Sequence, residues 1–345
     1  MSLQKTIPEI KNYSLKEYLA LSESAGIIDF PTYGILKFFG KDSLDLLNRL
    51  STNNLENLQE NHGVQTVITS NKGKILDLLQ VFRTENHLLA LTSLNNESKV
   101  MEHIEFFTFS EDVDVKKVTE NKCVYKISGP RSQVLLNKLF AKLPSSISPF
   151  TVLETSINDN NFKIIRTDFI KQPAFIIIGN IVSKKILDDA FSNIVENSDF
   201  EFVKPEAIEA LRISNGVPEF GKELTDKYNP LEGNLINSIS FNKGCYIGQE
   251  VIARLDTYKK IQNILCLIEF KSSEISQNLP NNLYLEEKSF GVLTSLSKSP
   301  DNESYLGLAY ISKKFTDLFA LKNFQAELSS KETIQVSYIK PADPV

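Results

Sequence analysis

Short apolar segments of strand length alternate with amphipathic segments of helical length along most of the chain. These patterns predict, in chain order, strands at 66–69, 75–82 and 87–92, a helix at 97–106, strands at 162–167 and 174–178, and helices at 183–194 and 205–213. Strands grouped between helices in this order favour an α+β fold with antiparallel sheets over a doubly wound parallel sheet.

Residues 35–50 and 124–139 form an internal repeat at an offset of 89 residues. Seven of the sixteen aligned positions are identical without a gap, and each copy predicts a strand, a glycine turn and an amphipathic helix. We interpret the repeat as a duplication, which predicts a core of two related α+β halves over residues 1–260. The alternative is that strand–glycine–helix units resemble one another for physical reasons alone.

From residue 261 onward the pattern changes to short alternating segments separated by polar clusters. The segments of this part that predict strands lie at 264–270, 283–285, 291–296, 305–310 and 333–338. Several short strands at regular spacing predict a small antiparallel barrel or sandwich over residues 261–345.

Composition and charge narrow the function classes. The 345 residues carry a net charge of −5, so the chain lacks the basic surface that direct nucleic-acid binding needs. It has no run of about 18 apolar residues and no signal-like N-terminal segment, which predicts a cytoplasmic protein without membrane contact. The three cysteines are widely spaced and the three histidines show no ligand spacing, so we expect free thiols and no metal site.

The residues most suited to chemistry surround Cys245. Gly244 precedes this cysteine and Gly248 follows it, so we expect a tight backbone that other groups can approach closely. Lys243 and Arg254 are cationic neighbours that would lower the pKa of the Cys245 thiol. A buried structural cysteine beside a turn is the alternative interpretation of the same residues.

Eight consecutive residues at 243–250, KGCYIGQE, resemble the signature of the YgfZ-type folate-binding family, whose relatives include the T-protein aminomethyltransferase. The motif residues that carry the resemblance are Lys243, Gly244, Cys245, Tyr246, Gly248, Gln249 and Glu250. Segments at 26–29, 71–77, 211–224 and 229–233 are similar to the family as well, so the resemblance spans most of residues 25–315.

The resemblance implies a ring of three modules, in which a duplicated ferredoxin-like core and a C-terminal antiparallel β-barrel surround an opening for tetrahydrofolate. It also implies that Cys245 is the functional residue, at the mouth of this opening, and that Tyr33 and Asp77 contact the folate. A flat pterin stacks on aromatic groups while a carboxylate pairs with its amino and ring N–H groups, which suits these residue types. Simple packing of Tyr33 on a strand is the alternative.

Two departures from the T-protein pattern bear on the reaction. T-proteins commonly carry two adjacent acids where this chain has Asp77 and Leu78, and a glutamate where it has Ser214. Both departures count against aminomethyl transfer by the usual arrangement. The resemblance then implies a tetrahydrofolate-binding factor that uses Cys245 to assist the assembly or repair of iron–sulfur proteins, including tRNA-modifying enzymes. The alternative is a folate-dependent aminomethyltransferase or demethylase that transfers a one-carbon unit.

Overall fold

The two copies of the repeat fold as the same local unit in the computed structural model, which describes residues 13–140, 143–272, 275 and 278–345. Strand β2 (Tyr33–Phe39) leads into helix α2 (Ser43–Leu50), and β7 (Lys122–Ser128) leads into α4 (Ser132–Leu139). The turns contain Gly40 and Gly129, whose φ angles are 100° and 129°. A Cβ atom would lie 2.0 Å from a backbone oxygen at the first turn and 2.5 Å at the second, so both turns require glycine.

Each half of the core forms one sheet, and four strands follow the same order in both. The first sheet has the order β3–β4–β5–β2–β6 and the second β8–β9–β10–β7–β1–β11. Besides β2 and β7, the two sheets contain β1 (Gly26–Ile28), β3 (Gly63–Thr69), β4 (Ile75–Arg83), β5 (Leu88–Ser93), β6 (Asp114–Lys117), β8 (Val152–Ile157), β9 (Asn160–Phe169), β10 (Gln172–Asn180) and β11 (Glu201–Phe202). The β2 and β7 strands of the repeat therefore occupy corresponding positions.

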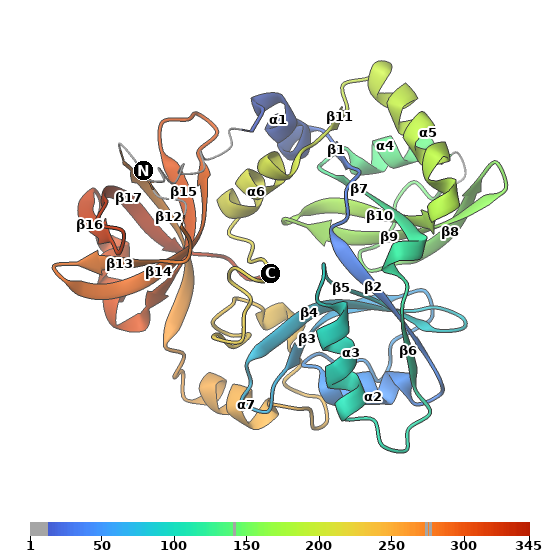
Figure 1. Cartoon of the computed structure of the whole chain (residues 1–345), viewed down its shortest axis with the longest axis horizontal. Coiled ribbons are helices and arrows are strands. Elements are labelled where there is room, and N and C mark those ends of the chain that lie inside the picture. Colours follow the sequence, from blue (N-terminus) through green and yellow to red (C-terminus); the bar gives the residue numbers. More distant parts are fainter. Residues whose placement is uncertain (1–12, 141–142, 273–274, 276–277) are drawn as a thin grey trace, which may run out of the picture.

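The two sheets pack face to face, with helices on their outer sides (Figure 1). Ile35 of β2 and Ile176 of β10 belong to the cluster between the sheets. The next residue on each strand points the other way, so Leu36 packs beneath α2 and α3 (Glu97–Phe106), and Ile177 packs beneath α4 and α5 (Lys184–Glu196). Burial on both faces explains why β10 is a nearly continuous apolar run.

The C-terminal segment closes into a six-stranded antiparallel barrel, which confirms the α+β fold with a C-terminal β unit. The barrel strands are β12 (Asn263–Lys271), β13 (Asn281–Leu285), β14 (Lys288–Lys298), β15 (Tyr305–Ser312), β16 (Phe324–Leu328) and β17 (Thr333–Pro341). The sequence patterns missed β16, because only its Ala326 and Leu328 are buried. The division predicted at 260–261 falls between α7 (Gln249–Thr257) and β12.

Two further helices link the units around the ring in Figure 1. Helix α1 (Leu15–Glu23) packs on α6 (Pro205–Ser214), and α6 in turn packs against β14 and β15 of the barrel. Within the described ranges, no helix has both the length and the apolar character needed to cross a membrane. Residues 1–12, part of the segment in which no signal sequence was found, lie outside those ranges.

Candidate functional site

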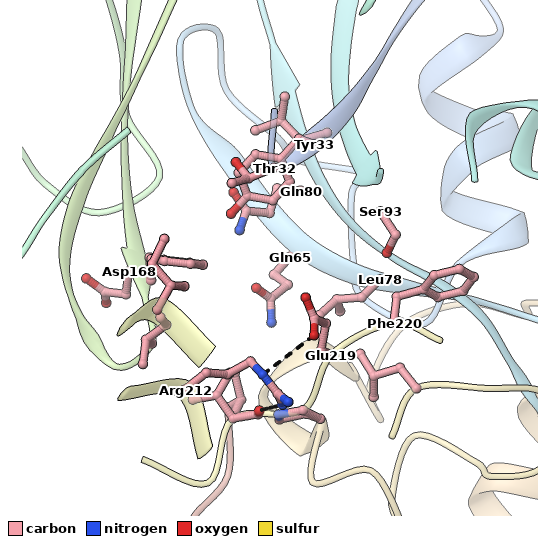
Figure 2. Close-up of a pocket in the computed structure, with 18 of the residues that line it drawn as sticks. Thr32, Tyr33, Gln65, Leu78, Gln80, Ser93, Asp168, Arg212, Glu219 and Phe220 are labelled. Carbon is pink, nitrogen blue, oxygen red and sulfur yellow. Dashed lines mark hydrogen bonds and ion pairs between the residues drawn. The ribbon is translucent and has the colours of Figure 1, made fainter. Parts of the chain in front are cut away.

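A cavity of about 1350 Å³ lies where the two sheets meet the barrel. Its walls come from β3, β4 and β5 of one sheet, β7 and the β9–β10 hairpin of the other, α6 with the segment after it, and β14 of the barrel. Figure 2 shows side chains from several of these elements around a common space. A large cavity at a junction of structural units is the usual place for a small-molecule ligand.

Lys126 on β7 is the most unusual group in the wall of this cavity. It is 1% exposed, and its Nζ atom lies 4.2 Å from the ring centre of Tyr33 and 3.4 Å from that of Phe169. Burial lowers the pKa of the Lys126 amine well below its ordinary value, while the charge of Glu219 has the opposite effect. Tyr33, predicted as a folate contact, thus lines the cavity beside a buried amine.

Three buried polar atoms on this side of the cavity have no hydrogen-bond partner among the described residues. They are Lys126 Nζ, Thr32 Oγ1 and Gln172 Oε1, and all three residues line the cavity. Buried polar atoms in folded proteins are nearly always paired, with protein, water or ligand. Three unpaired buried atoms on residues that line one cavity are therefore unusual for a folded protein.

Asp77 lies behind the cavity wall, because its position on β4 turns the side chain away from the space that Leu78 faces. The carboxylate is fully buried and accepts hydrogen bonds from Ser93 Oγ at 2.5 Å and from the Leu78 amide at 2.8 Å. Burial raises the pKa of Asp77 to about 6, and the Ser93 hydroxyl is the leading opposing cause. The hydrogen bond with Ser93 ties Asp77 of β4 to the end of β5, and Asp77 is not among the residues that line the cavity.

A different carboxylate, that of Glu219, enters the cavity. It follows α6, and in Figure 2 it lies near Leu78 and Phe220. Its side chain is 47% exposed, and Oε2 lies 2.7 Å from Lys222 Nζ and 3.7 Å from Arg212 Nε. Ser214, at the position where T-proteins commonly carry glutamate, is not among the residues lining the cavity. Glu219 therefore brings a carboxylate to the cavity from the loop after α6, in addition to the lining acids Asp168, Glu206 and Glu209.

Arg212 fixes the position of this loop. Its guanidinium donates to Val217 O at 2.6 Å and to Glu223 Oε2 at 3.0 Å. Glu223 is fully buried, and its second oxygen accepts from Thr294 and Ser295 of β14, both at 2.6 Å. A buried carboxylate with a cation and two hydroxyl donors is fully satisfied, so this network anchors the loop to the barrel.

Lys243 of the motif is a structural residue in this fold. Its ammonium donates to the main-chain oxygens of Asn48, Ser51 and Asn53 at 2.6, 2.9 and 2.6 Å. These carbonyls lie at and beyond the C-terminal end of α2, where a positive charge is favoured by the helix dipole. Burial lowers the pKa of Lys243 to about 8, so the ammonium form still predominates at pH 7. The amine is directed at α2 and not at the thiol two residues later.

Gly248 and its neighbours dock the motif onto the β3–β4 hairpin. Gly248 has a φ of 85°, and a Cβ atom there would lie 2.6 Å from Ser70 O. The Thr69 hydroxyl donates to Ile247 O at 2.6 Å, while Tyr246 is buried against α7. Gln249 then begins α7.

The remaining motif residues face solvent. Cys245 is an exposed free thiol, whereas Cys123 and Cys266 are buried. Glu250 and Arg254 lie exposed on α7. Cys245 is absent from the residues that line the cavity, and its expected place at the mouth of the opening stays a prediction. The nearest cavity-lining positions upstream are 237–238, because the motif turns away toward α2 and the hairpin.

Comparison with known proteins places this fold in a family. Residues 6–243 match the GCVT N-terminal domain. The chain belongs to the GCVT family. A crystal structure of the glycine cleavage system aminomethyltransferase T from Bartonella henselae matches the fold of this family member with a TM-score of 0.76. That match covers 94% of this chain and 88% of the other at 18% identity, so it supports a T-protein-like fold.

Curated relatives of this GCVT family member have names that refer to transferases. A chloroplastic protein of Arabidopsis thaliana, named as a candidate transferase, is 28% identical over 86% of this chain and 67% of its own length. The aminomethyltransferase of Thermotoga neapolitana is 24% identical over 92% of this chain and 88% of its own.

Two cavity residues were missed by the sequence analysis. Lys126 lies inside the second copy of the repeat and was not singled out there, although a charge within an apolar strand is a recognisable signal. Glu219 lies in a loop whose direction no pattern predicts. Within residues 13–140, 143–272, 275 and 278–345, no three histidine, cysteine, aspartate or glutamate side chains are grouped as a metal site would require.

Proposed function

We propose that this protein binds tetrahydrofolate, or a derivative, in the central cavity, and that Cys245 assists the assembly or repair of iron–sulfur proteins, including tRNA-modifying enzymes. The observation that carries the proposal concerns strand β4. At the position where T-proteins commonly carry their second acid, this chain presents Leu78 to the cavity, which counts against the usual aminomethyl transfer. Direct nucleic-acid binding forms no part of it, and a cytoplasmic location remains a prediction.

The groups of the cavity suit a reduced folate. Tyr33 and Phe169 offer aromatic faces for a flat heterocycle, and Glu219 offers a carboxylate for its amino and ring N–H groups. The unpaired polar atoms of Thr32 and Gln172 give further hydrogen-bonding positions. In this proposal Glu219 takes the role that the sequence analysis gave to Asp77.

Aminomethyl transfer is the less suitable reaction for this site. In the T-protein pattern, the acid beside the reacting nitrogen would come from the positions of Asp77 and Leu78. Leu78 has no ionisable group, and Asp77 is buried behind the strand with its oxygens bonded to Ser93 and to the main chain. Proton transfer requires an ionisable group within hydrogen-bond reach of the reacting atom, and neither residue offers such a group to the cavity.

Cys245 supplies a thiol that is chemically separate from the cavity. It is exposed on a loop held by Lys243 on one side and by Gly248 on the other, so its position is fixed while its sulfur stays accessible. A thiol in this setting suits transient contact with a client protein or its cluster, which would be cargo and not a resident cofactor.

A folate-dependent one-carbon transferase is the second candidate. It is favoured by the family match and by relatives that are themselves named aminomethyltransferases. In that case the cavity would hold the reacting centre and Cys245 would be dispensable.

A complementation experiment separates the two candidates. Cys245→Ala, expressed in a strain that lacks its own factor of this type, is expected to fold and bind folate but not to restore iron–sulfur enzyme activity. Cys123→Ala and Cys266→Ala serve as controls, because both thiols are buried and are expected to restore it at only a packing cost. Full complementation by Cys245→Ala would refute the thiol's role and favour the transferase.

A further inference from the structure

The cavity contains a buried amine that the proposed function does not use. Lys126 is 1% exposed, and its Nζ has no hydrogen-bond partner among the described residues. It extends from β7 into the space between Tyr33 and Phe169, whose rings both line the cavity. A lysine that only stabilised the fold would normally bring its ammonium to solvent or to a carboxylate.

We propose that Lys126 is a reactive amine that condenses reversibly with a small uncharged aldehyde entering this cavity. The step requires neither folate nor Cys245, although it takes place beside Tyr33 and Phe169, the two rings of the proposed folate site.

The chemistry follows from the surroundings of Nζ. Removal from water disfavours the ammonium form, and Glu219 is the charged group that opposes this effect. A desolvated lysine amine keeps its lone pair and becomes nucleophilic, as in lysines that form Schiff bases. Amines of this kind add readily and reversibly to aldehydes.

The condensation needs no oxidant or reductant. The Lys126 nitrogen forms a bond to the aldehyde carbon, the C=O pair moves to oxygen, and a proton passes from nitrogen to that oxygen. Loss of the resulting hydroxyl with one proton as water then gives the imine, and addition of water reverses the step.

The two aromatic rings explain why the aldehyde should be small and uncharged. They cover Nζ so closely that the atom is inaccessible in this structure. Phe169 ends β9 at the tip of the β9–β10 hairpin and is only half-buried, so its ring is the part of the cover that can move aside. A bulky molecule would not fit between the two rings, and a charged one would lose its hydration against their apolar faces.

Reductive trapping tests the proposal directly. The full chain is treated at pH 6.5, without folate, with less than one equivalent of formaldehyde and with cyanoborohydride, which converts the imine to N-methyl-lysine for peptide mass spectrometry. We expect Lys126 to be methylated at least about tenfold faster than Lys171. Lys171 is a demanding control, because it lines the same cavity but is exposed.

Two variants complete the test. Lys126→Arg should lose the fast site without any change at Lys171, and Phe169→Ala should speed methylation of Lys126 severalfold by uncovering its nitrogen. In urea-unfolded protein, Lys126 should lose its advantage. Methylation of Lys126 no faster than that of Lys171, in both folded wild type and Phe169→Ala, would overturn the proposal. Because no folate is present, this result would leave the proposed folate site unaffected.

Discussion

Replacing Lys243 by methionine tests whether this motif residue stabilises the fold. Methionine keeps most of the aliphatic stem but removes the ammonium that donates to Asn48, Ser51 and Asn53 at 2.6, 2.9 and 2.6 Å. Ser51 is fully buried, so its carbonyl would lose its donor, whereas the carbonyls of the half-buried Asn48 and Asn53 can be reached by water.

The magnitude follows from these exposures. A hydrogen bond from a charged group contributes about 1.5–3 kcal/mol, and a buried carbonyl without a donor costs about 1–3 kcal/mol. We count the full cost for the buried Ser51 carbonyl and part of it for the carbonyls of Asn48 and Asn53. The free energy of unfolding should then fall by about 2–4 kcal/mol. For a chain of this size that corresponds to a fall of about 3–6 °C in Tm.

Thermal unfolding followed by circular dichroism measures this shift, with Lys259→Met as the matched control. Lys259 follows α7, its side chain is 76% exposed, and its ion pair is with the partly exposed i−3 neighbour Asp256, so the change is expected to alter stability by less than about 0.5 kcal/mol. Equal Tm values for Lys243→Met and Lys259→Met would refute the structural role. The thiol would then regain Lys243 as an activating neighbour.

Two further predictions concern the motif turn and the buried acid. Gly248→Ala places a Cβ 2.6 Å from Ser70 O at a φ of 85° and should cost about 2–4 kcal/mol in urea unfolding, whereas Gly244→Ala meets nothing within 4 Å and should be nearly neutral. Burial raises the folded pKa of Asp77 from 3.8 to about 6, so the folded state binds more protons between these values and stability falls by about 2 kcal/mol as pH rises from 4 to 6. Asp77→Asn should remove that slope; an unchanged pH profile would assign it to other groups.

Much of the fold could be predicted from local patterns. The helix expected at 97–106 has the bounds of α3. The alignment of the repeat pairs Gly40 with Gly129, and both glycines have the positive φ angle that their turns require. Short strands with few buried side chains, such as β16, escaped prediction because their pattern is too brief to distinguish from a loop.

The site was less predictable, because it depends on which way neighbouring side chains point. Asp77 and Leu78 are adjacent on one strand, so a single step in register decides which of them faces the cavity. Lys243 is close to Cys245 in sequence, yet its amine is directed at carbonyls about 190 residues away in the chain. The position of Glu219 depends on the network around Arg212 and Glu223, which joins the end of α6 and the loop after it to Thr294 of β14, 71 residues beyond Glu223.

Calorimetric titration with tetrahydrofolate tests the central claim most directly. The wild-type protein should bind one equivalent saturably, and Glu219→Gln should bind it about 10–100-fold more weakly, the loss of a hydrogen bond to a charged group. Lys222→Gln, which removes the neighbouring cation but keeps the carboxylate, is the matched control and should bind at least as well as Glu219→Gln. Absence of binding heat from the wild-type protein at millimolar tetrahydrofolate would contradict the account.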